Sequence, residues 1–103
     1  MQLNEYQKLA MSFRLPSANQ IYSITGLTGE VGEFNSLIAK SVRDHKGLLD
    51  VLAIKKEIGD ILWFVAAIAA DYGFSLNDIA MSNIEKLNSR KERNTIQGSG
   101  DDR

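Results

Sequence analysis

The sequence contains no cysteine, one histidine (His45) and one proline (Pro16) among its 103 residues. Without cysteine the chain can form no disulfide, thiolate zinc site or cysteine nucleophile, and one histidine cannot supply a histidine metal cage. The lack of cysteine is compatible with a reducing cytoplasm. We expect the protein to remain in the cytoplasm, because its first residues lack the basic and then apolar order of a secretory signal.

Neither sign of charge is in excess, since 12 Lys and Arg residues stand against 13 Asp and Glu residues. Such a chain has no overall field to attract a nucleic-acid polymer or an anionic membrane, and we expect neither as a partner. A long apolar run is also missing, because the longest, residues 61–70, is about half of the ~20 residues that span a bilayer. With 44% hydrophobic residues, the chain should fold as one soluble domain.

Apolar residues recur every three or four positions in four segments, and no segment shows the alternation typical of a β-strand. The spacing predicts helices over residues 4–14, 17–44, 51–72 and 75–93. Pro16 ends the first helix, residues 45–47 separate the second from the third, and Gly73 ends the third. Two pairs resemble capping boxes at the starts of the first and last helices: Asn4 with Gln7, and Ser75 with Asp78.

Four such helices predict an all-α fold, most simply an antiparallel four-helix bundle over residues 1–93. Residues 94–103 contain a single apolar side chain, Ile96, and we expect them to form a flexible tail. Residues 61–70 are apolar on nearly every helix face, which is more than four short helices can cover. We therefore expect a homo-oligomer, a tetramer in preference to a dimer. The alternative is a monomer in which the third helix is buried all round.

Two acidic pairs lie on the second and third predicted helices, Glu30 with Glu33 and Glu57 with Asp60. Residues three apart share one helix face. If the helices fold back at residues 45–47, Glu33 comes level with Glu57 and Glu30 with Asp60, across ~8–10 Å between helix axes. A single acidic pair is usually solvated surface, but Glu57 and Asp60 border an apolar seam. Four converging carboxylates repel one another, so the pattern predicts a bound cation.

The ligand types indicate which cation could bind. Sites made only of oxygen suit Mg²⁺, Mn²⁺ or Ca²⁺, whereas zinc and copper prefer the histidine and cysteine ligands that this chain lacks. A di-iron centre is disfavoured, because di-iron bundles pair glutamates with Glu-x-x-His and the second pair here is Glu57-x-x-Asp60.

The segments GLTGEVGEF (residues 26–34) and EIGDILWF (residues 57–64) carry this pattern. Together they resemble the paired Glu-x-x-Glu and Glu-x-x-Asp motif of the MazG-like all-α nucleotide pyrophosphatases. The similarity extends over residues 4–93 and includes NIEKL at residues 83–87. The resemblance implies hydrolysis of a nucleoside triphosphate to the monophosphate and pyrophosphate, with Mg²⁺, or else Mn²⁺, as the cofactor. Its metal-binding and catalytic residues would be Glu30, Glu33, Glu57 and Asp60, with Glu33 preferred for orienting the attacking water.

Substrate contacts are expected from polar and aromatic side chains. The candidates are Asn83, Lys86 and Arg90 on the last helix, with Lys56 and Trp63 on the third and Lys40 on the second. Asn83, Lys86 and Arg90 share a stripe with Arg93 that could grip a triphosphate. For the arginines, a solvated basic face near a helix C-terminus is the alternative. Trp63 could stack on a base or simply pack beside the seam.

Gly26, Gly29 and Gly32 do not form a phosphate-binding loop, because the Gly-Lys-Ser/Thr ending of such a loop is absent. We interpret them as positions of close helix packing.

A second functional hypothesis is a non-catalytic oligomeric helical bundle that binds metal or nucleotide and acts through a partner protein. It predicts the same fold, so only the release of pyrophosphate from a nucleoside triphosphate separates the two hypotheses.

Overall fold

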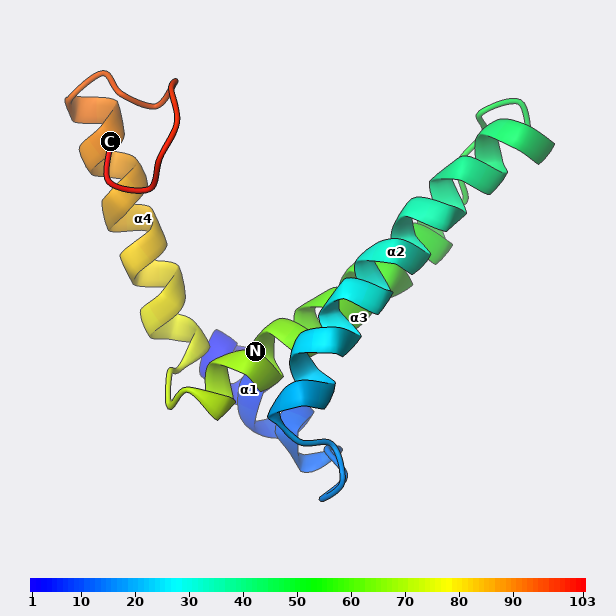
Figure 1. The fold of residues 1–103 in the computed structure, drawn as a ribbon, viewed down its shortest axis with the longest axis horizontal. Helices are drawn as coiled ribbons and strands as arrows, with labels where there is room; N and C mark the ends of the chain where they lie inside the picture. The colour runs from blue at the N-terminus through cyan, green and yellow to red at the C-terminus, as the bar shows by residue number, and fades with distance from the viewer.

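The computed structural model describes residues 1–103, and it contains four α-helices and no β-strand (Figure 1). The helices are α1 (Leu3–Ser12), α2 (Gln20–Asp44), α3 (Val51–Asp71) and α4 (Leu76–Glu92). The predicted all-α class is confirmed, and every helix end lies within three residues of its predicted position. None of the four has the length and hydropathy that a bilayer-crossing segment requires.

Side-chain caps explain where three of the helices begin. Asn19, Asp50 and Ser75 each accept a hydrogen bond from the backbone N–H group three residues later, at 2.9–3.1 Å. Such caps satisfy N–H groups that have no partner inside the helix. The cap at Asn19 moves the start of α2 beyond the predicted start at Ser17, while the cap at Ser75 is the predicted one.

Helices α2 and α3 form an antiparallel hairpin, the most extensive helix pair in the chain (Figure 1). The chain reverses through Lys46 and Gly47, whose φ angles of 54° and 80° lie in the left-handed region. Glycine adopts this region without strain, which explains the break in the helical pattern here. Residues at equal distances from the turn therefore come level on the two helices.

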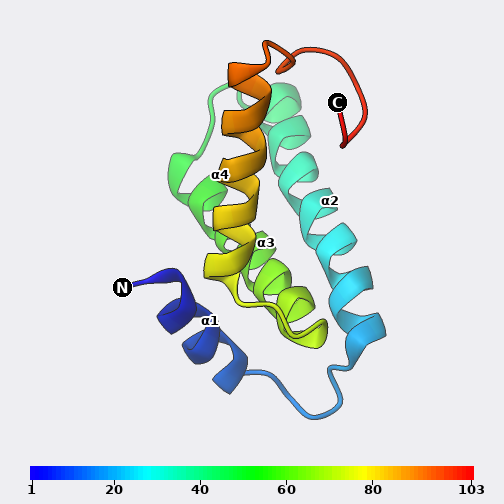
Figure 2. The same ribbon diagram turned by 90° about the vertical axis from the view of Figure 1, so that its left-hand side faces the viewer.

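Helix α1 braces the far end of α3 and the start of α4 (Figure 2). Gln7 Nε2 donates to Ala66 O at 3.3 Å, and Gln7 Oε1 accepts from the backbone N–H of Leu76 at 3.0 Å. Asn4 Oδ1 accepts from the backbone N–H of Asn77 at 3.0 Å. The predicted capping box of α1 is therefore wrong: Asn4 and Gln7 cap α4, and no side chain caps α1.

Helix α4 diverges from the α2–α3 hairpin, so one chain has an open V shape (Figure 1). The radius of gyration is 16.7 Å, compared with about 13 Å for a compact chain of this length. A single chain therefore does not form the predicted antiparallel four-helix bundle by itself. Two features set the direction of α4: Gly73 turns the backbone at a φ of 75°, and hydrogen bonds from the sequence-distant residues Asn4 and Gln7 hold the start of α4.

The core of the single chain is small. Its buried apolar residues are Ala10, Phe64, Ala66, Ala67, Ala69 and Leu76. The molecule has two arms, the α2–α3 hairpin and α4 with the tail. Large apolar side chains on both arms stay exposed, including Ile21 (72%), Val42 (65%) and Ile84 (56%). A monomer rarely exposes so much apolar surface without a use for it.

The tail, residues 94–103, folds back on the end of α4 (Figure 1). Asp101 Oδ1 lies 2.8 Å from Lys86 Nζ and 3.2 Å from Arg90 Nη2. Arg103 donates to the backbone oxygens of Thr95 and Ile96 at 3.1 and 2.9 Å. The boundary at residue 93 and the flexibility of the tail stay predictions.

Candidate functional site

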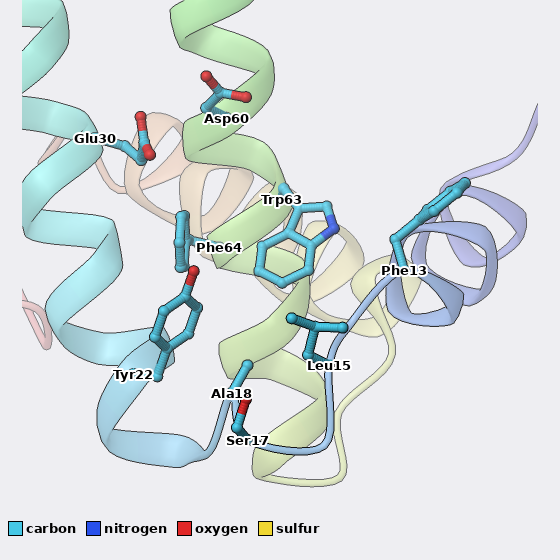
Figure 3. Close-up of a pocket in the computed structure, with 9 residues that line it drawn as sticks. All are labelled: Phe13, Leu15, Ser17, Ala18, Tyr22, Glu30, Asp60, Trp63 and Phe64. Atoms are coloured by element: carbon cyan, nitrogen blue, oxygen red, sulfur yellow. The ribbon is translucent and has the colours of Figure 1, made fainter.

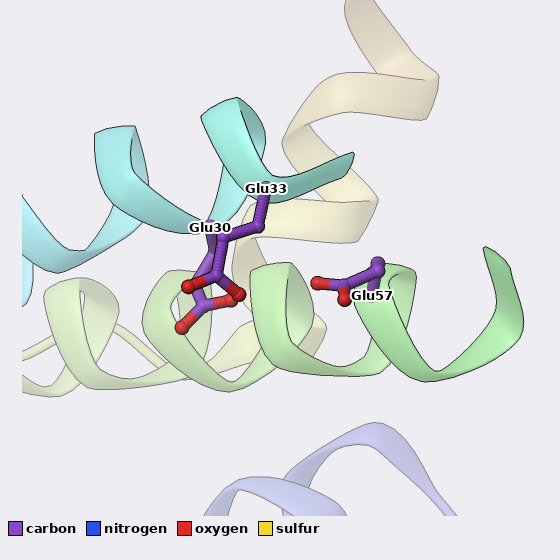
Figure 4. Close-up of side chains that lie close together, drawn as sticks. All are labelled: Glu30, Glu33 and Glu57. Carbon is purple, nitrogen blue, oxygen red and sulfur yellow. The ribbon is translucent and has the colours of Figure 1, made fainter. Parts of the chain in front are cut away.

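Three acidic side chains converge between α2 and α3 (Figure 4). Glu30 and Glu33 come from α2 and Glu57 from α3, and one carboxylate oxygen of each lies within 4.8 Å of the others. Glu30 Oε2 and Glu57 Oε2 are buried and accept no hydrogen bond. A buried carboxylate oxygen without a partner is costly, so this cluster could accept a cation or a hydrogen-bond donor.

The electrostatics of the cluster support this interpretation. Burial raises the pKa of Glu30 above its ordinary value, and the neighbouring charges of Glu33, Asp60 and Glu57 raise it further. None of the four acids takes part in an ion pair. The repulsion within the cluster is therefore uncompensated by the protein's own lysines and arginines.

Asp60 lies at the edge of the cluster and is exposed. It is absent from the tight group formed by the other three, but it faces Glu30 across the hairpin (Figure 3). Its charge also raises the pKa of Tyr6, after burial of the phenol as the larger cause. The predicted convergence of four acids thus holds for three, with Asp60 beside them.

A cavity of about 390 Å³ opens next to Glu30 and Asp60 (Figure 3). It lies between the α1–α2 connection and the α2–α3 hairpin. Its lining residues are Phe13, Leu15, Ser17, Ala18, Tyr22, Glu30, Asp60, Trp63 and Phe64. The cavity therefore joins an aromatic end to an acidic end.

The aromatic end is built on Phe64. The ring centroid of Phe64 lies 5.0 Å from that of Trp63, in an edge-to-face arrangement, and 5.7 Å from that of Tyr22. Trp63 Nε1 donates to Ala10 O at 3.0 Å, which fixes the indole against α1. Of the residues singled out from sequence as substrate contacts, Trp63 alone reaches this cavity.

Gly26 makes room for Phe64, because a Cβ atom at Gly26 would lie 2.2 Å from the Phe64 ring. The expectation of close packing is therefore confirmed at Gly26. It is wrong at Gly29 and Gly32 within the single chain, where an added Cβ atom would meet nothing within 4 Å.

The lysines near the acids lie on the hairpin. Lys40 lines a shallow groove with Glu33 and Glu57, and Lys56 is exposed directly before Glu57 on α3. Lys40 therefore lies beside two of the acids, whereas Lys56 lies on a different helix face from Glu57, and neither lysine pairs with an acid in the free chain.

The candidates on α4 lie elsewhere in the single chain. Asn83, Lys86 and Arg90 follow α4 away from the hairpin (Figure 1). Lys86 and Arg90 are instead paired with Asp101 of the tail, and the Arg90 side chain is buried there. One chain by itself does not bring the polar stripe of α4 to the acid cluster.

Sequence reasoning missed the α1–α2 connection and Tyr22 as parts of the cavity. A signal existed for Tyr22, because it precedes Gly26 by one helical turn on α2. Glycine has no side chain, so a glycine beside an aromatic residue on one helix face leaves room for a second aromatic ring. The connection carried no comparable signal, since its position depends on how it crosses α3.

The fold and site define an all-helical protein with a carboxylate cluster on a helical hairpin beside an aromatic cavity. The MazG nucleotide pyrophosphohydrolase domain matches residues 20–95, which is more than half of the chain. The chain therefore belongs to the MazG nucleotide pyrophosphohydrolase family. It is also similar to the Gene 37 protein of Mycobacterium phage L5, with 39% identity over 85 residues, covering 80% of this chain and 75% of the phage protein. No solved structure matches the chain.

Proposed function

We propose that the chain is a magnesium-dependent pyrophosphohydrolase that converts a ribo- or deoxyribonucleoside triphosphate and water to the monophosphate and pyrophosphate. The observation that carries the proposal is the group of Glu30, Glu33 and Glu57, with two buried and unpartnered carboxylate oxygens. Membership of the MazG family supports this reaction and a nucleotide substrate.

The donor set fits a hard divalent cation. It consists of carboxylate oxygens alone, and burial together with the neighbouring negative charges raises the pKa of Glu30. Mg²⁺ suits such a set and Mn²⁺ could replace it. Glu30, Glu57 and Asp60 would hold the metal together with Glu33. When bound, the metal would neutralise phosphate charge and make a water molecule more acidic.

Glu33 is the residue proposed to orient the attacking water, because it is the exposed member of the converging group. The anhydride bond between the α- and β-phosphates would break. One product would gain the hydroxyl group of the attacking water, and the other would gain the remaining proton. Positioning and charge neutralisation carry most of such a reaction, so a chain without a cysteine nucleophile is adequate.

The shape of the cavity suggests how the nucleotide lies. Its aromatic end offers Trp63, Phe64 and Tyr22 to a planar base, and its acidic end leads to Glu30 and Asp60. We place the base against the aromatic residues and the triphosphate toward the acids. Lys40, which lines a groove with Glu33 and Glu57, is then a protein cation available to the phosphates, and Lys56 stays a further candidate.

We also propose that the protein is a homo-oligomer, a tetramer in preference to a dimer. The exposed apolar side chains of both arms support this, as does the small core of the single chain. In an assembly, Asn83, Lys86 and Arg90 could reach the acid cluster of a second copy. Sedimentation at micromolar concentration should give a multiple of 11.4 kDa; a mass near 11.4 kDa would contradict the assembly.

The deciding experiment is an assay of pyrophosphate release. Purified protein is incubated with excess Mg²⁺ and each common ribo- and deoxyribonucleoside triphosphate, with a chelator as the control. Equal amounts of monophosphate and pyrophosphate, formed only with metal, support the proposal. Tight binding without hydrolysis would favour the non-catalytic helical bundle.

The cytoplasm, where nucleoside triphosphates are made and used, is the compartment that fits this activity.

A further inference from the structure

Arg14 stands between two cavity-lining residues, Phe13 and Leu15, in the connection between α1 and α2 (residues 13–19). Phe13 and Leu15 are largely exposed, at 78% and 68%, whereas the Arg14 side chain is 16% exposed. Arg14 therefore points away from the cavity and into the protein. A half-buried arginine needs acceptors for the part of its guanidinium that is removed from water.

The guanidinium of Arg14 has these acceptors on three separate segments. Nε donates to Ala18 O at 2.8 Å, within the connection itself. Nη2 donates to the fully buried Ser23 Oγ on α2 at 2.8 Å. Nη1 and Nη2 form a two-pronged ion pair with Asp71 at the end of α3, at 2.8 and 3.1 Å. The rigid fork of arginine suits this arrangement, and lysine cannot reproduce it.

The connection has little else to hold it in place. Its own backbone hydrogen bonds are local, from Phe13 to Ala10, from Arg14 to Met11, from Ala18 to Leu15 and from Asn19 to Ser17. The side-chain hydrogen bonds that join it to α3 all start at Arg14. Since Leu15, Ser17 and Ala18 form one wall of the cavity, the position of that wall depends on Arg14.

We propose that Arg14 is a positioning residue that sets the shape of the aromatic cavity and, through it, the affinity for the base of the nucleotide. Arg14 acts through the wall and does not touch the substrate. The effect on nucleotide affinity rests on the proposed function, whereas the effect on the wall does not.

The wall is tested in the nucleotide-free protein. Trp63 is the single tryptophan of the chain and lines the cavity, so quenching of its fluorescence by acrylamide measures access to the cavity. Arg14→Lys, which keeps the charge but loses the fork, should at least double the quenching constant. Arg43→Lys is the matched control, because it is the same change at an arginine that pairs only with the neighbouring Asp44 in an exposed ion pair. Equal quenching in the parent and in folded Arg14→Lys would overturn the proposal.

The effect on the substrate is tested by steady-state kinetics below the melting temperature of every variant. Arg14→Lys should raise KM for the preferred nucleoside triphosphate about tenfold, the equivalent of about 1.4 kcal/mol, and leave kcat within about twofold. An arginine that merely stabilised the fold would lower the melting temperature with KM unchanged. That result, or a fall in kcat alone, would contradict the proposal.

A milder variant covers the case in which replacement of Arg14 prevents folding. Asp71→Asn leaves the bonds from Arg14 to Ala18 and Ser23, so it should raise quenching and KM in the same directions but less. Unchanged quenching in folded Asp71→Asn would then overturn the proposal. If the parent neither hydrolyses nucleotides nor changes Trp63 fluorescence when they are added, the proposed function fails, and the quenching experiment still decides the role of Arg14.

Discussion

Two acidic residues, Glu30 on the α2–α3 hairpin and Asp101 on the α4 arm, lie in opposite electrostatic environments. On the α2–α3 hairpin, Glu30 sits among Glu33, Glu57 and Asp60, and its pKa is raised by burial and by these charges. On the α4 arm, Asp101 sits between Lys86 and Arg90, and hydrogen bonds and charge from both lower its pKa. Asp101 is thus paired with cations of its own arm, whereas the acid cluster of the hairpin leaves carboxylate oxygens of Glu30 and Glu57 without a partner.

This difference distinguishes a structural ion pair from a candidate binding site. Asp101 contributes to the position of the tail and needs nothing further. The hairpin acids destabilise the free protein, and such an arrangement persists where a ligand offsets it. Charge balance, more than the number of acids, identifies the hairpin as the candidate site.

The largest contrast should appear in catalysis. Glu57→Gln removes one charge from the cluster with little change in volume, so the fold should persist while magnesium-dependent hydrolysis falls by well over tenfold, or ~1.4 kcal/mol. Glu92→Gln is the matched control, being the same change at an exposed site on the other arm. An initial-rate assay of pyrophosphate release decides; a Glu57→Gln rate above about a tenth of the parent rate would remove Glu57 from the proposed ligands.

The next effect is stabilisation by metal. Magnesium that binds the folded hairpin and hardly at all the unfolded chain adds about 2.7 kcal/mol at a hundred times its dissociation constant, a rise of about 10 °C or more in melting temperature. The measurement is thermal unfolding with and without metal. A quadruple variant, in which Gln replaces Glu30, Glu33 and Glu57 and Asn replaces Asp60, should show no rise in melting temperature. An equal rise in parent and variant would place the metal elsewhere.

Gly26→Ala should have a somewhat smaller effect. The added Cβ atom would overlap the Phe64 ring, so Phe64 must move or the helices must separate, at a cost of about 2 kcal/mol. Gly29→Ala is the matched control, because nothing lies near Gly29. Denaturant unfolding and the fluorescence of Trp63, which contacts Phe64, are the measurements. Equal stability of Gly26→Ala and the parent would contradict the close packing.

The smallest effects concern pH, and they should differ in sign between the arms. The raised pKa of Glu30 favours folding below its unfolded value of 4.5, and this contribution is lost as pH rises through the folded value. The lowered pKa of Asp101 favours folding above its unfolded value of 3.8, and this contribution is lost as pH falls through the folded value.

In metal-free melting experiments at pH 7, Glu30→Gln should therefore be more stable than the parent and Asp101→Asn slightly less stable. Both differences should shrink as the pH falls toward 3. Asp101 is largely exposed, so solvent screens its pairing and its effect is the smaller of the two. Differences of the same sign at pH 7 would contradict the contrast between the arms.

The sequence was informative about the hairpin because the relevant geometry is local. Helical periodicity and the break at residues 45–47 define two antiparallel helices, and the positions of Glu30, Glu33 and Glu57 relative to the turn then bring them level. The resemblance of these segments to the MazG-like motif was confirmed for the family by the match over residues 20–95.

The sequence was uninformative about the direction of α4 and about the wall of the cavity. The open angle follows from Asn4 and Gln7, which bond to α4 from more than 60 residues away in the chain. Helical periodicity gives the apolar face of α4 but no reason for that face to stay unpaired within one chain. The same holds for Arg14, which has the appearance of an ordinary loop residue until Ser23 and Asp71 are placed beside it.

By itself, then, the sequence determined the four helices, the acidic pairs and the exclusion of cysteine and histidine chemistry, because these depend on residue type and on spacing within a few turns. Only the tertiary structure decided that three acids meet while Asp60 stays at the edge, that Lys86 and Arg90 pair with the tail, and that an aromatic cavity adjoins the acids. These features depend on side chains distant in the chain meeting at defined angles. Hydrogen bonds from a few residues, such as Gln7 and Arg14, set those angles.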